Sequence, residues 1–114
     1  MALPRKYSLK LGSDFALVKE KGKFYSHSFS GLLVLESGGP LSRFGFLISK
    51  RIDPRAVYRN RLKRKLSLAV VFFLPRIKPG FKVVFLPREK MKDQSGEEVK
   101  KVVSQLLAEA KLLN

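Results

Sequence analysis

The apolar positions in the middle of the chain follow helical spacing. They recur at intervals that place them on one side of a helix, and they are Leu62, Leu66, Ala69, Val70 and Phe73. Asp53 is a suitable N-cap residue, and Pro54 fits the first helical position, where no N–H is needed. Pro75 ends the helix. Residues 70–74 would also suit a strand, but the apolar stripe runs through them in phase and favours the helix.

Two further helices are predicted near the ends of the chain. Ser13 can cap a short helix that Gly22 ends, and its apolar positions are Leu11, Phe15 and Val18. The last helix begins with a capping box, in which Ser95 and Glu98 each bond to the other's N–H. Its apolar face consists of Val99, Val102, Val103, Leu106, Ala110 and Leu113.

The remaining apolar segments predict strands. Residues 24–25 and 29–36 are typical of strand, with Gly31 consistent with a bulge. In residues 43–49, Phe44, Phe46 and Ile48 alternate with Arg43, Gly45, Leu47 and Ser49. The turn residues 37–40 lie between the last two segments, which predicts an antiparallel hairpin. Residues 81–86, after the Pro79-Gly80 turn, form a short buried strand.

The predicted order is helix, hairpin or meander, helix, strand, helix. No linker divides it, so residues 1–114 are expected to form a single α+β domain. Strand 43–49, the middle helix and strand 81–86 would place the two strands parallel. The general rule makes such a crossover right-handed.

The composition restricts the chemistry. The 114 residues contain 24 Lys and Arg against 9 Asp and Glu, giving a net charge of +15 and a pI near 10.5. Hydrophobic residues make up 45%, which suffices for a core. The absence of Cys excludes disulfides and thiolate sites, and the single His27 excludes a two-histidine metal site. We therefore expect no metal site on the protein.

The longest apolar run, residues 68–74, is too short to cross a bilayer. The first residues lack the apolar stretch of a secretion signal. A cytoplasmic protein that meets a polyanion is expected, with no membrane partner. Nucleic acid is the most abundant polyanion, and an anionic membrane surface is the alternative.

The positive charge is concentrated in the middle of the chain. Eight cations stand against the single Asp53 in residues 50–65, namely Lys50, Arg51, Arg55, Arg59, Arg61, Lys63, Arg64 and Lys65. On the helix, Asn60 and Arg64 point away from the apolar stripe, with Arg61 and Lys63 beside them. Guanidinium groups bind phosphate bidentately, and an amide can bond phosphate, sugar or base.

Two alternatives concern this helix. Arg59 falls on the core side, so either the regular helix starts late or Arg59 reaches a groove between helix and sheet. A merely solvated helix face would need acids four residues away, and there are none between Asp53 and Glu89.

Aromatic residues are interleaved with the charge: Phe15, Phe24, Tyr25, Phe29, Phe44, Phe46 and Tyr58. Such rings can stack on bases, although each ring taken singly is more often part of a core. Phe44 and Phe46 share a face and must have the same role, whereas Phe15 and the tyrosines are better candidates for exposure. His27 is interpreted as a loop residue. The acids are scattered, which argues against catalysis by the protein itself.

Ser49-Lys50-Arg51, followed by the run from Arg59 to Arg64 (R-N-R-L-K-R), resembles the bacterial ribonuclease P protein family. The resemblance covers nearly the whole chain and includes its length and charge. It implies an α-β-β-β-α-β-α sandwich with a mixed sheet, like domain 2 of ribosomal protein S5. It also implies a left-handed crossover, contrary to the general rule.

The resemblance further implies that an RNA is the catalyst and that Mg²⁺ bound by this RNA activates the water. The protein would dock on the catalytic RNA, one protein per RNA, and hold the 5′ leader of precursor tRNA between the first helix and the sheet. Binding of DNA is not expected.

By position, the residues implied to bind RNA are Lys50, Arg51, Arg55, Arg59, Asn60, Arg61, Lys63, Arg64 and Lys65. Those implied to line the leader cleft are Phe15, Lys19, Leu33, Ser49 and Arg88. Lys19 stands where the family often has a second aromatic residue, Leu33 where it often has tyrosine, and Ser67 where it has a further arginine. The loop at residues 53–55 is one residue longer. These departures concern stacking in the cleft more than docking on RNA.

Three other functions compete with this interpretation. A ribosomal or other structural RNA-binding protein shares the charge without a reason for the signature. A DNA-binding regulator would need a dimer, which outward-facing Leu68, Val71 and Phe72 could supply. A self-sufficient nuclease lacks a site.

Overall fold

In the computed structural model, which describes residues 3–10 and 12–114, the chain follows the predicted order α-β-β-β-α-β-α. Its elements are α1 (Ser13–Lys21), β1 (Lys23–Ser26), β2 (Ser30–Glu36), β3 (Arg43–Phe46), α2 (Ala56–Phe73), β4 (Phe81–Pro87) and α3 (Gly96–Glu109). Short 3-10 helices span Arg5–Tyr7, Leu74–Arg76 and Glu89–Asp93. The fold class is α+β, as predicted. Leu11, which helped to predict the first helix, lies outside the described residues.

The four-stranded sheet has the order β1-β2-β4-β3. β2 pairs antiparallel with β1 and with β4, whereas β3 and β4 are parallel. The predicted hairpin between residues 29–36 and 43–49 is therefore wrong, because β4 lies between these two segments. β4 is central because both its faces are apolar: Val83 and Phe85 pack into one core and Val84 into another.

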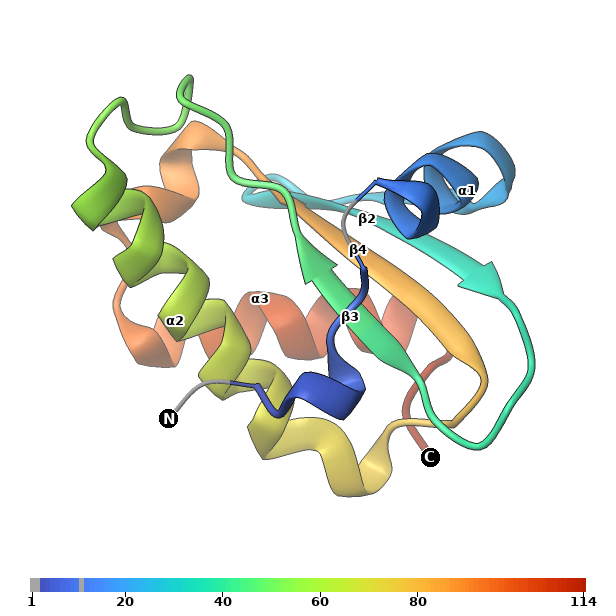
Figure 1. The fold of residues 1–114 in the computed structure, drawn as a ribbon. Coiled ribbons are helices and arrows are strands. Elements are labelled where there is room, and N and C mark those ends of the chain that lie inside the picture. The colour runs from blue at the N-terminus through green and yellow to red at the C-terminus, as the bar shows by residue number, and fades with distance from the viewer. Residues whose placement is uncertain (1–2, 11) are drawn as a thin grey trace.

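The helices cover the sheet unequally, as Figure 1 shows: α2 and α3 lie on one face and α1 on the other. The five apolar residues that predicted α2 are all buried in the larger core, together with Val99, Val102, Val103 and Leu106 of α3. The smaller core beneath α1 contains Leu9, Val18 and Val84. Within the described ranges, no helix has the length and apolar character needed to cross a membrane.

α2 connects the parallel neighbours β3 and β4. This is the predicted strand–helix–strand unit, and it places the first turns of α2 beyond the end of β3. The hand of the crossover and the likeness to domain 2 of ribosomal protein S5 stay predictions.

Two of the predicted caps are wrong. α2 begins at Ala56 rather than near Asp53, because the Asp53 carboxylate accepts the Arg55 N–H at 2.9 Å and holds the chain in a local turn. α1 begins at Ser13 itself, and Gly12, with φ of +86°, occupies the N-cap position. Ser95 does cap α3, since its hydroxyl accepts the Glu98 N–H at 3.2 Å. The return bond of the predicted capping box is absent from the bonds between described residues.

Gly31 does not mark a bulge, because the pairing register of β2 runs through it without interruption. A Cβ atom at Gly31 would lie 2.8 Å from Cε1 of Phe24. Glycine is therefore required because the Phe24 ring lies directly over the strand.

Candidate nucleic-acid interface

The outer face of α2 carries a group of free polar and cationic heads. Asn60, Arg61, Lys63 and Arg64 are exposed, as the helical spacing predicted. Within the described part of the chain, no hydrogen bond or ion pair ties these four side chains to other residues; Arg61 only faces the Tyr58 ring, 5.0 Å from its centroid. Their bonding capacity thus remains available for an external anion. We call these four residues the α2 face.

Arg55 and Arg59 have a second role, because both organise the loop before α2. Arg59 donates to the carbonyl oxygens of Asp53 and Pro54 at 2.9 and 2.8 Å. The late start of the helix thus explains its position, and Arg59 does not reach a groove beside the sheet. Arg55 forms an ion pair with Asp53 at 2.9 Å, and its guanidinium lies 3.9 Å from the centroid of the Tyr58 ring.

The electrostatics of this loop follow from the same contacts. Hydrogen bonds from Arg55 lower the pKa of Asp53 from 3.8 to about 2. The same carboxylate raises the pKa of Arg55. The Asp53 side chain is 4% exposed, whereas that of Arg55 is 62% exposed. Arg55 therefore presents its charge to solvent while the buried carboxylate fixes its direction.

The other predicted RNA-binding cations differ in their surroundings. Lys50 and Arg51 are exposed in the turn that follows β3 and leads toward α2. Lys65 is half-buried and donates to the carbonyl oxygen of Gln94 at 2.8 Å. Its contact joins α2 to the segment before α3, so Lys65 has a structural role that its position in the run did not reveal.

A mainly apolar hollow of about 360 Å³ lies between α1 and the sheet. Its lining consists of Gly12, Phe15, Ala16, Lys19, Leu33, Leu47, Val84 and Leu86. Three of the five predicted cleft residues are thus brought together: Phe15, Lys19 and Leu33. Leu47, which the family resemblance does not include, also lines the hollow and is 53% exposed; the alternation of residues 43–49, which places it on the face opposite Phe44, is the signal that points to it.

The two remaining predicted cleft residues do not line this hollow. Ser49 is exposed beyond the end of β3. Arg88 follows β4 and donates to the carbonyl oxygen of His27 at 3.1 Å and to the Ser26 hydroxyl at 3.3 Å. Arg88 therefore fastens the end of β4 to the connection between β1 and β2.

Gly45 sets the position of the Phe15 ring. A Cβ atom at Gly45 would lie only 2.6 Å from Cζ of Phe15, so the ring rests directly on the backbone of β3. Phe24 of β1 pairs with Leu33 of β2, and its ring lies over Gly31. Phe24 is 52% exposed. Phe24 therefore extends the apolar surface from the hollow toward the sheet edge.

The other aromatic residues divide between core and surface. Phe44 is buried and Phe46 packs against the larger core, stacked on Phe85 with ring centroids 5.5 Å apart. The pair therefore belongs to the core. Tyr58 is 40% exposed between two arginines. His27 lies in a loop, as predicted, with Nε2 at 2.7 Å from Oε1 of Gln105.

Comparison with known proteins identifies the family. A family model described as Ribonuclease P matches residues 3–111. The ribonuclease P protein component of Microcystis aeruginosa is 35% identical over 118 residues, covering 100% of this chain and 98% of that one. That of Synechocystis sp. is 40% identical over 87 residues, covering 75% and 70%.

Solved structures of RNase P proteins have the same fold as this chain. The RNase P protein from Thermotoga maritima, in complex with 1-(4-fluorophenyl)-2-thiourea, has a TM-score of 0.81 and 27% identity over 87% of this chain and 95% of that one. The Staphylococcus aureus RNase P protein shares the fold with a TM-score of 0.85 and 22% identity, over 95% and 98%. These relatives do not favour the alternative of a structural RNA-binding protein outside tRNA processing. The chain therefore belongs to the ribonuclease P protein family and has a subunit role in the processing of tRNA 5′ ends.

Proposed function

We propose that this chain docks on the catalytic RNA of ribonuclease P through the α2 face and holds the 5′ leader of precursor tRNA at the hollow beside Phe15. The observation that carries the proposal is the free state of the α2 face. In a chain of net charge +15, these side chains make no internal ion pair or hydrogen bond within the described residues. Such a face favours RNA binding, because its cations neutralise RNA phosphates and release the counterions condensed on the RNA.

The loop before α2 supports docking by holding its arginines ready. Asp53 and the carbonyl of Pro54 fix the guanidinium groups of Arg55 and Arg59, as described above. A cation whose direction is set before binding loses less conformational entropy when it meets a phosphate. Lys50 and Arg51, in the preceding turn, would add charge to the same end of the molecule.

The hollow supports contact with an unpaired strand. Phe15 offers a ring that rests on Gly45, and Leu33, Leu47 and Leu86 provide apolar surface around it. Bases of single strands stack on rings at a gain of about 1–3 kcal/mol per base. Lys19, exposed at the hollow, would meet a phosphate of the same strand. Phe24 supplies a second ring beyond Leu33.

In this proposal the bond cleavage takes place on the RNA. Mg²⁺ would be held by the RNA and would activate the water there, while the protein screens RNA–RNA repulsion and fixes the leader. One protein would bind per RNA, in the cytoplasm. Addition of this protein to a bacterial catalytic RNA should therefore raise precursor cleavage at low Mg²⁺. Cleavage by the purified protein without RNA would contradict the proposal.

Docking is tested by the salt dependence of binding to the catalytic RNA. The double variant Arg61→Ala/Arg64→Ala should weaken binding and reduce the slope of log K against log salt by about 0.7–0.9 for each phosphate that is no longer neutralised. The matched control Arg76→Ala/Lys101→Ala removes the same charge from exposed positions elsewhere. An equal change in both variants would show that only total charge matters and would refute a specific α2 face.

Leader binding is tested by comparing precursor tRNA with mature tRNA as ligands of the assembled holoenzyme. Phe15→Ala should lower the preference for the precursor about 5- to 150-fold, corresponding to one stacked base, and leave docking on the catalytic RNA unchanged. Phe72→Ala is the control, since Phe72 is an exposed ring on α2 outside the hollow. An unchanged preference in Phe15→Ala would exclude the hollow as the leader site.

A further inference from the structure

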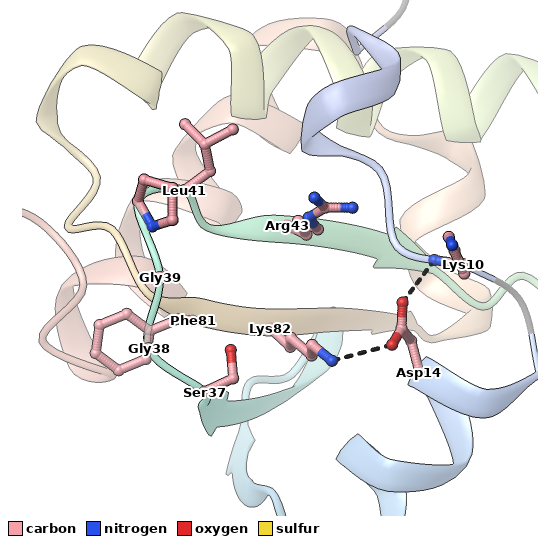
Figure 2. A pocket seen from close by; sticks show the side chains of 10 residues that line it. Lys10, Asp14, Ser37, Gly38, Gly39, Leu41, Arg43, Phe81 and Lys82 are labelled. Atoms are coloured by element: carbon pink, nitrogen blue, oxygen red, sulfur yellow. Dashed lines mark hydrogen bonds and ion pairs between the residues drawn. The ribbon is translucent and has the colours of Figure 1, made fainter.

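A second hollow, of about 390 Å³, lies where β3 and β4 begin. Figure 2 shows it between the loop of residues 37–41 and Asp14 at the start of α1. Three cations line it: Lys10, Arg43 and Lys82. It lies on the same face of the sheet as the hollow beside Phe15, but toward the opposite ends of β3 and β4 from Leu47 and Leu86, and the two linings share no residue.

Arg43 and Lys82 are direct register partners on neighbouring parallel strands. Both also line the hollow, so two like charges stand side by side on one face of the sheet. Like charges directly opposite each other across two strands destabilise a sheet. The ion pair of Lys82 with Asp14 offsets part of this repulsion, and an anion bound beside Arg43 would offset the rest.

The one carboxylate at the hollow is already engaged. The Asp14 carboxylate accepts a hydrogen bond from the Lys82 ammonium at 3.0 Å and another from the backbone N–H of Lys10 at 2.9 Å. Figure 2 shows both bonds. These two bonds, with the charge of Arg43 nearby, lower the pKa of Asp14. The Arg43 guanidinium has no hydrogen bond or ion pair with any other described residue. Asp14 therefore neutralises Lys82 and leaves the charges of Arg43 and Lys10 uncompensated.

The remaining wall of the hollow is built from backbone. Gly38 and Gly39 have φ of +74° and +96°, and a Cβ atom at either would meet nothing within 4 Å. The N–H groups of Ser37 and Gly38 both donate to the carbonyl oxygen of Gly80, at 2.8 and 3.0 Å, which fixes the loop against β4. The loop thus forms a fixed rim, and the hollow stays open there because Gly38 and Gly39 carry no side chains.

We propose that this hollow is a phosphate-binding site in which Arg43 and Lys10 bind the anion and Lys82, held by Asp14, adds its charge. Arginine matches phosphate bidentately, and lysine acts as a point charge, so the two chemistries suit a tetrahedral oxyanion. The phosphate group could belong to an RNA backbone or to a free phosphate monoester. The site does not depend on the α2 face or on the hollow beside Phe15.

The test is the thermal stability of the free protein as chloride is replaced by inorganic phosphate at constant ionic strength. Phosphate should raise the Tm of the unmodified protein, because a ligand of the folded state stabilises it by mass action. Arg43→Gln should weaken the apparent phosphate affinity about tenfold or more, while its Tm without phosphate stays the same or rises. Arg76→Gln, an exposed arginine outside the hollow, is the matched control. If phosphate raised the Tm of all three proteins equally, the effect would be general screening of the positive charge, and the proposal would be overturned.

Amide NMR locates the anion. Phosphate should shift the N–H signals of Lys10, Gly39, Arg43 and Lys82 saturably, and shifts that grow linearly over the whole basic surface would refute a site. A ten-nucleotide oligouridylate is then added to the phosphate-saturated protein. Displacement of phosphate at these amides assigns the site to an RNA backbone, and persistence of the phosphate shifts assigns it to a free phosphate monoester.

Discussion

The contact between Phe15 and Gly45 makes a quantitative prediction about the hollow beside α1. In Gly45→Ala the new methyl group would lie 2.6 Å from Cζ of Phe15, about 0.8 Å closer than the 3.4 Å at which ordinary contact begins. Overpacking of this kind costs about 1–3 kcal/mol. Replacing glycine in a strand returns about 0.5–1 kcal/mol, because alanine loses less conformational entropy on folding. A net loss of about 1 kcal/mol in the free energy of unfolding is expected.

A double-mutant cycle isolates the clash. In Phe15→Ala the ring is gone, and the next close atom is Cδ1 of Leu9 at 3.2 Å, which a small side-chain movement relieves. In that background Gly45→Ala should be neutral or stabilising, giving a coupling free energy of about 1–3 kcal/mol between the two positions. Urea unfolding followed by circular dichroism measures all four proteins, and the m value should stay constant.

The matched control is Gly96→Ala, at the first residue of α3, where a Cβ atom meets nothing within 4 Å. It should stabilise the protein by about 0.5–1 kcal/mol. If Gly45→Ala were equally destabilising with and without the Phe15 ring, the ring would not rest on β3 as described. The same displacement should reduce the preference of the holoenzyme for precursor over mature tRNA, because the ring moves within the hollow.

Three other predictions concern stability. Because the pKa of Asp53 is lowered, its carboxylate contributes to the free energy of unfolding above pH 3.8, and this contribution is lost as the pH falls toward 2. In Asp53→Asn the free energy of unfolding in urea should therefore depend less on pH between pH 5 and 2. An unchanged pH dependence would contradict the Arg55 ion pair. On α2, Leu66→Ala should cost about 2–5 kcal/mol and Leu68→Ala no more than about 0.5 kcal/mol, since only Leu66 is buried; similar losses in urea unfolding would argue against the orientation of α2. Ser95→Ala removes the cap of α3 and should cost about 1 kcal/mol in the same assay, whereas no change would show that the hydroxyl bond contributes nothing.

The existence of the three helices and the charged face of α2 could be predicted without coordinates. The stripe from Leu62 to Phe73 and the exposure of Arg64 depend on 3.6-residue periodicity, which is a local property of the chain. The Ser95 cap is local as well. The family resemblance rested on Ser49-Lys50-Arg51 and on the run from Arg59 to Arg64 in this helix, so it too could be recognised without coordinates.

The pairing of the strands and the partners of the individual cations could be learned only from the folded chain. The hairpin was predicted because β2 and β3 are close in sequence. It does not form, because β4 buries both its faces when it lies between these two strands. Lys65 and Lys63 look alike in the sequence, but Gln94, 29 residues beyond Lys65, engages only that lysine. Pairing of strands and partners of long side chains depend on contacts between distant segments, and local periodicity contains no information about them.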